Sequence, residues 1–237
     1  MPDGDDPTPY IVLGIFGLVL FAVVSWTVRS ALDRRYRDKI AAWAAAQGWN
    51  YREGGGGSWT QGLEQGIARG VELQMEGSRR DRQVTVAHYW YQTRESRQEP
   101  RQEYCGGQWT TRWETNIYTV THDLTVLAVH LPSVYPEISV ESRGLGSRIA
   151  HSFGWRDRNR LEQDSFDHAY RVRTEDPELG RSVVTPALVE AHLAGTVPLW
   201  SLRDHDLFTT WEGKIRVDLV PNRLDQLLDV ADLLGTI

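Results

Sequence analysis

Histidine and aspartate are the side chains of this sequence that could carry out acid–base chemistry or bind a metal. The seven histidines are scattered, and no HExxH, HxH or CxxC spacing occurs, so we expect no local metal site and no cofactor. Asp204-His205-Asp206 places carboxylates on both sides of an imidazole, but consecutive residues point in different directions, so we interpret this run as a polar hairpin tip. His88 and His130 lie in two predicted strands and could meet across a sheet, although two separate sheet histidines is the simpler interpretation.

Motifs for nucleophilic catalysis and nucleotide binding are also missing. The sequence has no GxSxG, and the GLG run at 144–146 lacks the third glycine of a dinucleotide fingerprint. The GGGGS run at 54–58 is not followed by a lysine, so it predicts a flexible linker or a loose turn and not a phosphate loop. Cys105 is the single cysteine, which excludes an intramolecular disulfide and weakly favours a reducing compartment. The catalytic residues, if any exist, are therefore unknown from the sequence.

Three aromatic residues lie in a polar stretch, residues 94–116, that we expect to be a long loop or an exposed hairpin tip. They are Tyr104, Trp109 and Trp113. Large aromatic side chains in an exposed polar segment are unusual and can mark a contact surface. These residues form a possible contact loop.

The overall composition is that of a folded globular protein. The chain has 237 residues, of which 41% are hydrophobic and 24% charged, which suits one domain of medium size beside an anchor. The net charge of −6 argues against nucleic acid as a general partner.

An apolar segment near the N-terminus predicts a transmembrane helix. Ile11–Val28 contains no charged residue, and about 18 residues at 1.5 Å each span roughly 27 Å, close to the hydrocarbon thickness of a bilayer. A cleaved signal peptide is less favoured because the preceding residues Asp3, Asp5 and Asp6 are acidic. A buried core helix would rarely be apolar on every face. The residues assigned to the membrane anchor are Tyr10, Ile11, Phe16, Leu20, Phe21 and Trp26.

Charge asymmetry around the apolar segment predicts its orientation. Only acidic side chains precede it, whereas a basic flank follows it, so the soluble part is expected on the cytoplasmic side of the cell membrane. The same basic side chains could contact anionic lipid headgroups. The positive-inside flank consists of Arg29, Arg34, Arg35, Arg37 and Lys39.

Periodicity predicts mostly strands, with helices late in the chain. A helix is expected over 29–47, ending at Gly48. Thr185-Pro186 begins a second helix, and an amphipathic helix follows Pro221. Strands are expected at 71–76, 84–93, 123–131 (ended by Pro132), 137–141, 170–173, 199–202, 206–211 and 215–219, with residues 203–205 turning a hairpin.

These elements predict an α+β fold: an N-terminal transmembrane helix, then a mainly antiparallel-sheet domain with late helices and an amphipathic C-terminal helix. The expected boundaries are 1–9 for a short outer tail, 10–28 for the transmembrane helix, 29–58 for the juxtamembrane helix and Gly-rich linker, and 59–237 for the soluble domain.

The residues Phe166, Tyr170 and Val172, followed by the run Thr185-Pro186-Ala187-Leu188, form a recognisable pattern. It resembles uncharacterised single-pass membrane proteins common in actinobacteria, with a cytoplasmic α+β domain. The LAVHLP run at 127–132 looks like their central strand, and Arg181-Ser182 departs from their pattern. The family has no assigned activity, so the resemblance implies a fold and an anchor and transfers no functional residue. The matching residues are Phe166, Tyr170, Val172, Asp176, Thr185-Pro186-Ala187-Leu188, Leu193, Trp200 and Leu207.

The anchor and the absence of a catalytic signature favour a membrane-tethered interaction or regulatory module that holds an unknown protein partner near the bilayer. A membrane-associated enzyme whose active site is assembled only in the fold remains an alternative. A domain that faces outward as an envelope component is a third.

Overall fold

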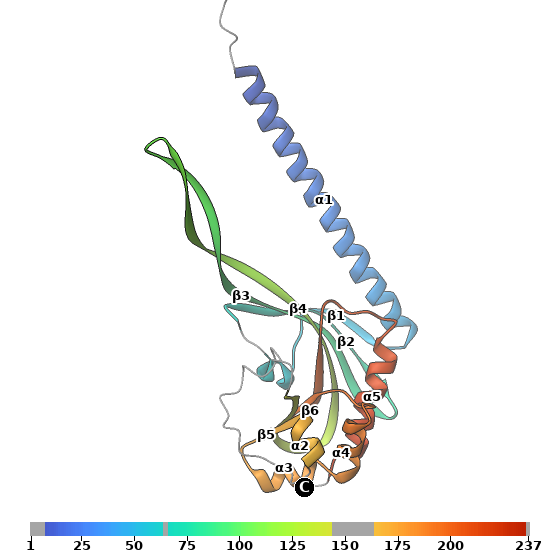
Figure 1. The fold of residues 1–237 in the computed structure, drawn as a ribbon. Coiled ribbons are helices and arrows are strands. Elements are labelled where there is room, and N and C mark those ends of the chain that lie inside the picture. Colours follow the sequence, from blue (N-terminus) through green and yellow to red (C-terminus); the bar gives the residue numbers. More distant parts are fainter. Residues whose placement is uncertain (1–7, 64–65, 144–163, 236–237) are drawn as a thin grey trace, which may run out of the picture.

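A computed structural model describes residues 8–63, 66–143 and 164–235, without the side chains of residues 8–15, 19 and 164. The acidic N-terminal residues 1–7 and the GLG run at 144–146 lie outside the described residues. A long N-terminal helix leads into a six-stranded antiparallel sheet, and short helices follow (Figure 1). The predicted α+β class is confirmed. The elements are α1 (Thr8–Ala46), β1 (Asn50–Glu53), the 3-10 helix η1 (Ser58–Gly62), β2 (Ala68–Arg79), β3 (Arg82–Cys105), β4 (Gln108–Ser142), α2 (Asp164–Ala169), β5 (Tyr170–Thr174), α3 (Pro177–Val183), α4 (Pro186–Leu193), β6 (Trp200–Glu212) and α5 (Val220–Leu233).

Helix α1 is continuous through both the apolar segment and the helix expected over 29–47. Its stretch Phe16–Ala46 is long and apolar enough to cross a membrane. The C-terminal end packs on the sheet, where Ile40 and Ala44 are buried. The helix ends where the sequence predicts, because Gly48 adopts φ +70° and the next N–H, from Trp49, donates to the carbonyl of Ala44.

The sheet has the strand order β1-β2-β3-β4-β5, with β6 also pairing with β4. The predicted strands 123–131 and 137–141 are both parts of β4, so the expected end at Pro132 is wrong. The pairing of β4 with β6 shifts register between His130 and Tyr135. A proline lacks the N–H needed for a regular ladder, and an irregularity of this kind lets the strand continue past it.

The hairpin expected between 199–202 and 206–211 is also wrong, because residues 200–212 form the single strand β6. Asp204, at the predicted turn, has φ +51° and pairs with Tyr135 at the irregular part of β4. The two strands therefore bend together, and the turn-like residues belong to a bulge. The strand expected at 215–219 is absent from the structure, which places these residues in the connection to α5.

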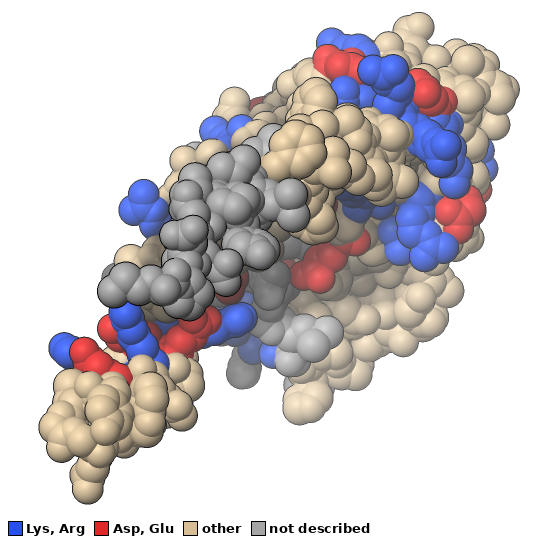
Figure 2. All heavy atoms as spheres, turned by 90° about the horizontal axis from the view of Figure 1, so that it is seen from above, with Lys and Arg blue, Asp and Glu red and all other residues tan. Residues whose placement is uncertain are grey.

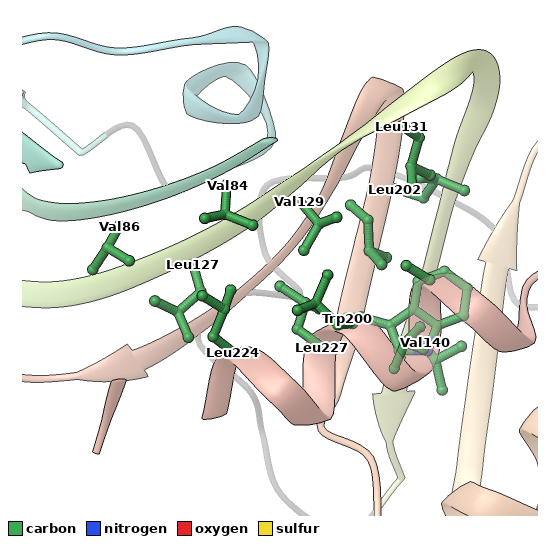
Figure 3. Close-up of a cluster of buried hydrophobic side chains, with 14 of the residues drawn as sticks. Val84, Val86, Leu127, Val129, Leu131, Val140, Trp200, Leu202, Leu224 and Leu227 are labelled. Carbon is green, nitrogen blue, oxygen red and sulfur yellow. The ribbon is translucent and has the colours of Figure 1, made fainter. Parts of the chain in front are cut away.

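Hydrophobic side chains pack on both faces of the sheet. On one face, α5 lies across the strands, and its Leu224 and Leu227 contact the same cluster as Leu127 and Val129 (Figure 3). This confirms the amphipathic C-terminal helix, because its apolar stripe faces the sheet. On the opposite face, a smaller cluster gathers around Trp59 of η1. Burial of each large side chain stabilises the fold by roughly 1.5–3 kcal/mol.

The glycine-rich run before η1 is a turn, which is one of the two structures that we expected for it, and it is not a flexible linker. Strand β1 precedes it and pairs with β2, so the sheet begins inside the stretch assigned to the linker. The N–H of Gly56 donates to Oε1 of Gln74 at 2.7 Å. Gly55 adopts φ +115°, which a residue with a Cβ rarely tolerates. The run is a turn held against the sheet.

Candidate functional site

A two-stranded ribbon projects from the sheet and carries the three aromatic residues of the predicted contact loop. Strands β3 and β4 stay paired as far as Cys105 and Gln108, and we call residues 94–119 the arm. Gly106 and Gly107 have φ +62° and +87°, as a tight two-residue hairpin turn requires. The arm rises on the same side of the domain as α1 (Figure 1). Of the two structures expected for residues 94–116, the exposed hairpin is confirmed.

The strand register gives the arm two different faces. Cross-strand partners share a face, and side chains alternate along each strand, so the unbroken pairing assigns every residue. The face that carries the aromatic residues has no charged side chain from position 96 outward, and we call it the uncharged face. It consists of Ser96, Gln98, Pro100, Gln102, Tyr104, Trp109, Thr111, Trp113, Thr115 and Ile117. The opposite, charged face carries Glu95, Arg97, Glu99, Arg101, Glu103, Arg112 and Glu114.

Large hydrophobic side chains of the uncharged face are open to solvent. Trp109 is 70% exposed, Trp113 63%, Ile117 71% and Tyr104 59%. The rings of Tyr104 and Trp109 lie 5.1 Å apart, so they form one aromatic group at the tip. A contiguous exposed group of this kind is typical of a contact surface.

The charged face of the arm is organised within the ribbon itself. Glu99 faces Glu114 and Arg101 faces Arg112 across the ladder, which would repel as direct pairs. The diagonal arrangement compensates, since Arg101 lies 3.3 Å from Glu114. These exposed ion pairs contribute little stability, so this face behaves as an ordinary solvated surface.

A chain of polar side chains links His130 on β4 to η1. Its Nδ1 lies 2.6 Å from Oδ1 of Asp206, and its Nε2 lies 2.8 Å from the hydroxyl of Thr85. Asp206 also accepts hydrogen bonds from the Ser58 hydroxyl and the Trp59 N–H. The hydrogen bond with Asp206 raises the pKa of His130. Burial raises the pKa of Asp206, but its hydrogen bonds with His130, Ser58 and Trp59 together outweigh burial and lower it.

Enzymes that activate a hydroxyl nucleophile hydrogen-bond an aspartate to a histidine and the histidine to the hydroxyl, as Asp206, His130 and Thr85 are arranged here. Thr85, however, is only 1% exposed, so its hydroxyl is closed to a substrate. The geometry instead fixes η1 onto the sheet, because Asp206 accepts hydrogen bonds from both the side chain and the backbone of that segment.

A second polar cluster lies where α1 crosses the sheet. His88 is fully buried, with Nε2 at 3.0 Å from Asp123 and Nδ1 at 3.2 Å from Glu72. The ring of Tyr36 on α1 meets His88 edge to face at a centroid distance of 5.8 Å. Arg37 on α1 lies 3.5 Å from Glu72. The cluster therefore ties α1 to β2, β3 and β4.

The hollows in the described part of the chain are not lined by any of these histidines. One hollow of about 250 Å³ lies between β4 and β6, lined by Trp200, Phe208 and Trp211, and Glu141 is the ionisable residue among its described lining. Another, of about 510 Å³, lies on the arm. Among the described residues, no group of three or more His, Cys, Asp or Glu side chains is arranged to hold a metal ion.

The structure separates the histidines and acids that the sequence set side by side. Asp206 turns inward to His130, while His205 lies 3.1 Å from the carbonyl of Leu131 and Asp204 is exposed. His88 and His130 do not meet, because each binds different acids.

The residues assigned to the anchor and its flank are mostly open to solvent. Phe16, Leu20, Phe21 and Trp26 are exposed, and the side chains of Tyr10 and Ile11 lie outside the described ones. In the flank, Arg37 differs from the others because it contacts Glu53 and Glu72. The exposed flank residues are Arg29, Arg34, Arg35 and Lys39.

Sequence reasoning missed the partners of the histidines and the two-faced character of the arm. Ser58, Glu72 and Asp123 lie in segments that no local pattern connects to a histidine. The arm did leave a signal, since in residues 96–104 charged side chains alternate with uncharged ones at the period of a strand.

Comparison with known proteins gives a fold likeness. No family model matches the chain, and no curated protein sequence matches it significantly. Among solved structures, it is similar to the crystal structure of the mycobacterial trehalose monomycolate transport factor A, TtfA. The two share 14% sequence identity at a TM-score of 0.51, over 86% of this chain and 96% of that chain. The likeness shows the fold alone, and it agrees in part with the actinobacterial resemblance of the sequence.

Proposed function

We propose that this chain is a membrane-tethered interaction module, in which α1 is the anchor and the arm contacts the partner. The observation that carries the proposal is the uncharged face of the arm, which presents exposed aromatic side chains on the same side of the domain as α1 (Figure 1). Helix α1 and the uncharged face of the arm both expose apolar side chains, and both extend from the same side of the domain. We therefore assign both to contacts at the membrane.

The anchor role rests on the exposed apolar side chains of α1. Phe16, Leu18 and Phe21 are each about 70% exposed, and lipid is the environment in which such a helix is stable. The exposed basic residues that follow favour a cytoplasmic location for the domain, beside anionic headgroups.

The fold likeness adds a setting to this proposal. TtfA is named as a factor in the transport of trehalose monomycolate, and its fold covers most of this chain. We propose the same kind of setting here, in which a tethered domain assists a transport process at the membrane.

Photo-crosslinking in native membranes tests whether the arm makes contacts. A photoactivatable residue at position 109, on the uncharged face, is expected to give crosslinks to protein or lipid. The same residue at position 108, on the charged face at the same height, is the matched control. Equal, background yields from both positions would contradict the proposed role of the arm.

A further inference from the structure

The arm is long enough to reach the membrane in which α1 would be anchored. Each strand of the arm has about 12 residues, which span roughly 40 Å at 3.3–3.4 Å per residue. The part of α1 between Arg29 and Ala46 covers about 25 Å at 1.5 Å per residue. In the view of Figure 1, the end of the arm lies level with the N-terminal half of α1, beyond the point where α1 would enter the membrane. The arm therefore reaches the membrane surface with length to spare, also when α1 is tilted, as transmembrane helices usually are.

The chemistry of the tip matches the boundary between lipid and water. Tyr104, Trp109 and Trp113 are of the two residue types enriched at that boundary, where an apolar ring and a polar group are both satisfied. The charged residues next to them along the chain, Glu103, Arg112 and Glu114, lie on the opposite face. Seen from the side toward which α1 rises, the projecting lobe at the lower left of Figure 2 ends in uncharged atoms, and charged side chains lie behind it.

Backbone hydrogen bonding limits how deep the tip can go. A two-stranded ribbon has two open edges, and each unpaired N–H or C=O costs several kcal/mol in hydrocarbon. Headgroups and water can pair with these groups, whereas lipid tails cannot. The headgroup layer is therefore the environment that accepts both the rings and the edges.

From these observations we infer that the partner of the arm is the lipid–water interface of the same membrane, with the uncharged face of the tip inserted among the headgroups. This inference rests on the proposed function and names the partner of its contact element. The inserted tip and α1 together attach the domain to the membrane at two points. Because Tyr36, Arg37 and His88 tie α1 to the sheet, the second contact fixes how the domain is rotated about the helix.

A cysteine on the uncharged face allows a direct test: Thr111→Cys in a Cys105→Ser chain, where position 111 is exposed and pairs with Gln102. An environment-sensitive fluorophore is attached there in the full chain, reconstituted in vesicles of phosphatidylcholine and phosphatidylglycerol. Nitroxide lipids report contact with the interface, and iodide reports access from water. A fluorophore on Glu190→Cys in a Cys105→Ser chain is the reference, because α4 lies at the opposite end of the domain from α1 (Figure 1).

We expect nitroxide lipids to quench the fluorophore at position 111 and iodide to quench it at least threefold less than the reference. Trp109→Glu with Trp113→Glu should abolish this difference. Gln108→Glu with Thr110→Glu, on the charged face, should preserve it. All four positions are exposed, so these substitutions leave the core intact.

A fluorophore at position 111 that is open to iodide and untouched by nitroxide lipids would overturn the inference. If position 109 nevertheless crosslinks to a protein in native membranes, or to a second copy of this chain, the proposed function stands and only its lipid partner is wrong. If position 109 gives no crosslinks either, the proposed function fails as well.

Discussion

The histidine side chains at positions 88, 130 and 192 lie in three different surroundings. His88 is enclosed between two carboxylates, and His130 shares a short hydrogen bond with Asp206 that raises its pKa. His192 is buried, accepts a hydrogen bond from Nε1 of Trp200 at 3.0 Å, and its pKa is lowered to about 4 by burial. The environments of His130 and His192 shift their pKa values in opposite directions, so these two residues give opposite dependences on pH.

Acid should destabilise the protein through His192. In the unfolded chain its pKa is near 6.5, so between pH 6.5 and about 4 the unfolded state binds more protons. The stability it contributes is complete above pH 6.5 and is lost as the pH falls toward 4, by on the order of 3 kcal/mol. Urea unfolding of the full chain in detergent at several pH values measures this. His192→Gln should flatten the dependence in that window, and an unchanged slope would contradict the assignment.

Asp206 should be far more important for stability than its neighbour Asp204. Asp206→Asn weakens the hydrogen bonds to Ser58, Trp59 and His130, and we expect a loss of about 2–3 kcal/mol in the free energy of unfolding. The exposed Asp204→Asn is the matched control, and asparagine tolerates the positive φ there. Chemical denaturation compares the two.

Titration of His130 in the same variant gives an independent readout. In the native protein its stabilisation is full below about pH 6.5 and is lost as the pH rises through its raised pKa. Without the charge of Asp206, NMR should show a lower pKa for His130. An unchanged value would show that the pair is not coupled.

At the scale of elements, β3 and β4 each serve two purposes. The parts of both strands outside the arm form the centre of the sheet, where Val86, Ala87 and Val126 are fully buried. The remaining parts form the arm, in which the large side chains contact solvent. Each strand is continuous, but its arm segment does not contribute to the core.

Shortening the arm should therefore leave the stability of the domain unchanged. Gln98 and Thr115 pair across the ladder, so residues 99–114 can be replaced by Asn-Gly, which closes a two-residue hairpin turn. We expect the free energy of unfolding to stay within about 0.5 kcal/mol, because no core residue is removed. Denaturant unfolding measures it. A loss of more than about 2 kcal/mol would show that the arm belongs to the folding unit.

At the scale of the whole molecule, α1 and the arm project from one side of the domain, while α2, α3 and α4 lie at the other end (Figure 1). The polar cluster around His88 joins the base of α1 to the sheet from which the arm extends. The orientation of the domain relative to a membrane is therefore set by the packing of α1 on the sheet as well as by the anchor itself.

The side of the membrane on which the domain lies can be measured with an impermeant thiol reagent. Because contact with lipid would shield Cys105, the reporter is Glu190→Cys in a Cys105→Ser chain, where the side chain is exposed on α4. The basic flank predicts labelling only after the cells are permeabilised. Labelling in intact cells would instead place the domain outside, as an envelope component.

The sequence alone determined the features that depend on neighbours along the chain. The apolar run of α1, the Thr185 cap and the apolar stripe of α5 follow from composition and period, and the structure has each of them. Thr185 accepts a hydrogen bond from the N–H of Leu188 at 3.2 Å, as an N-cap does. The alternation of charged and uncharged side chains in the arm can also be read from the sequence, because successive side chains of a strand point to opposite faces.

Only the tertiary structure decided the features that depend on register between distant segments. β6 is one strand because Asp204 meets the irregular part of β4, and β4 continues past Pro132 for the same reason. Asp206 reaches His130 only because their strands pair at that register. Pairing shifts by whole residues, and each shift changes every cross-strand neighbour, so local patterns cannot select the partners of a histidine.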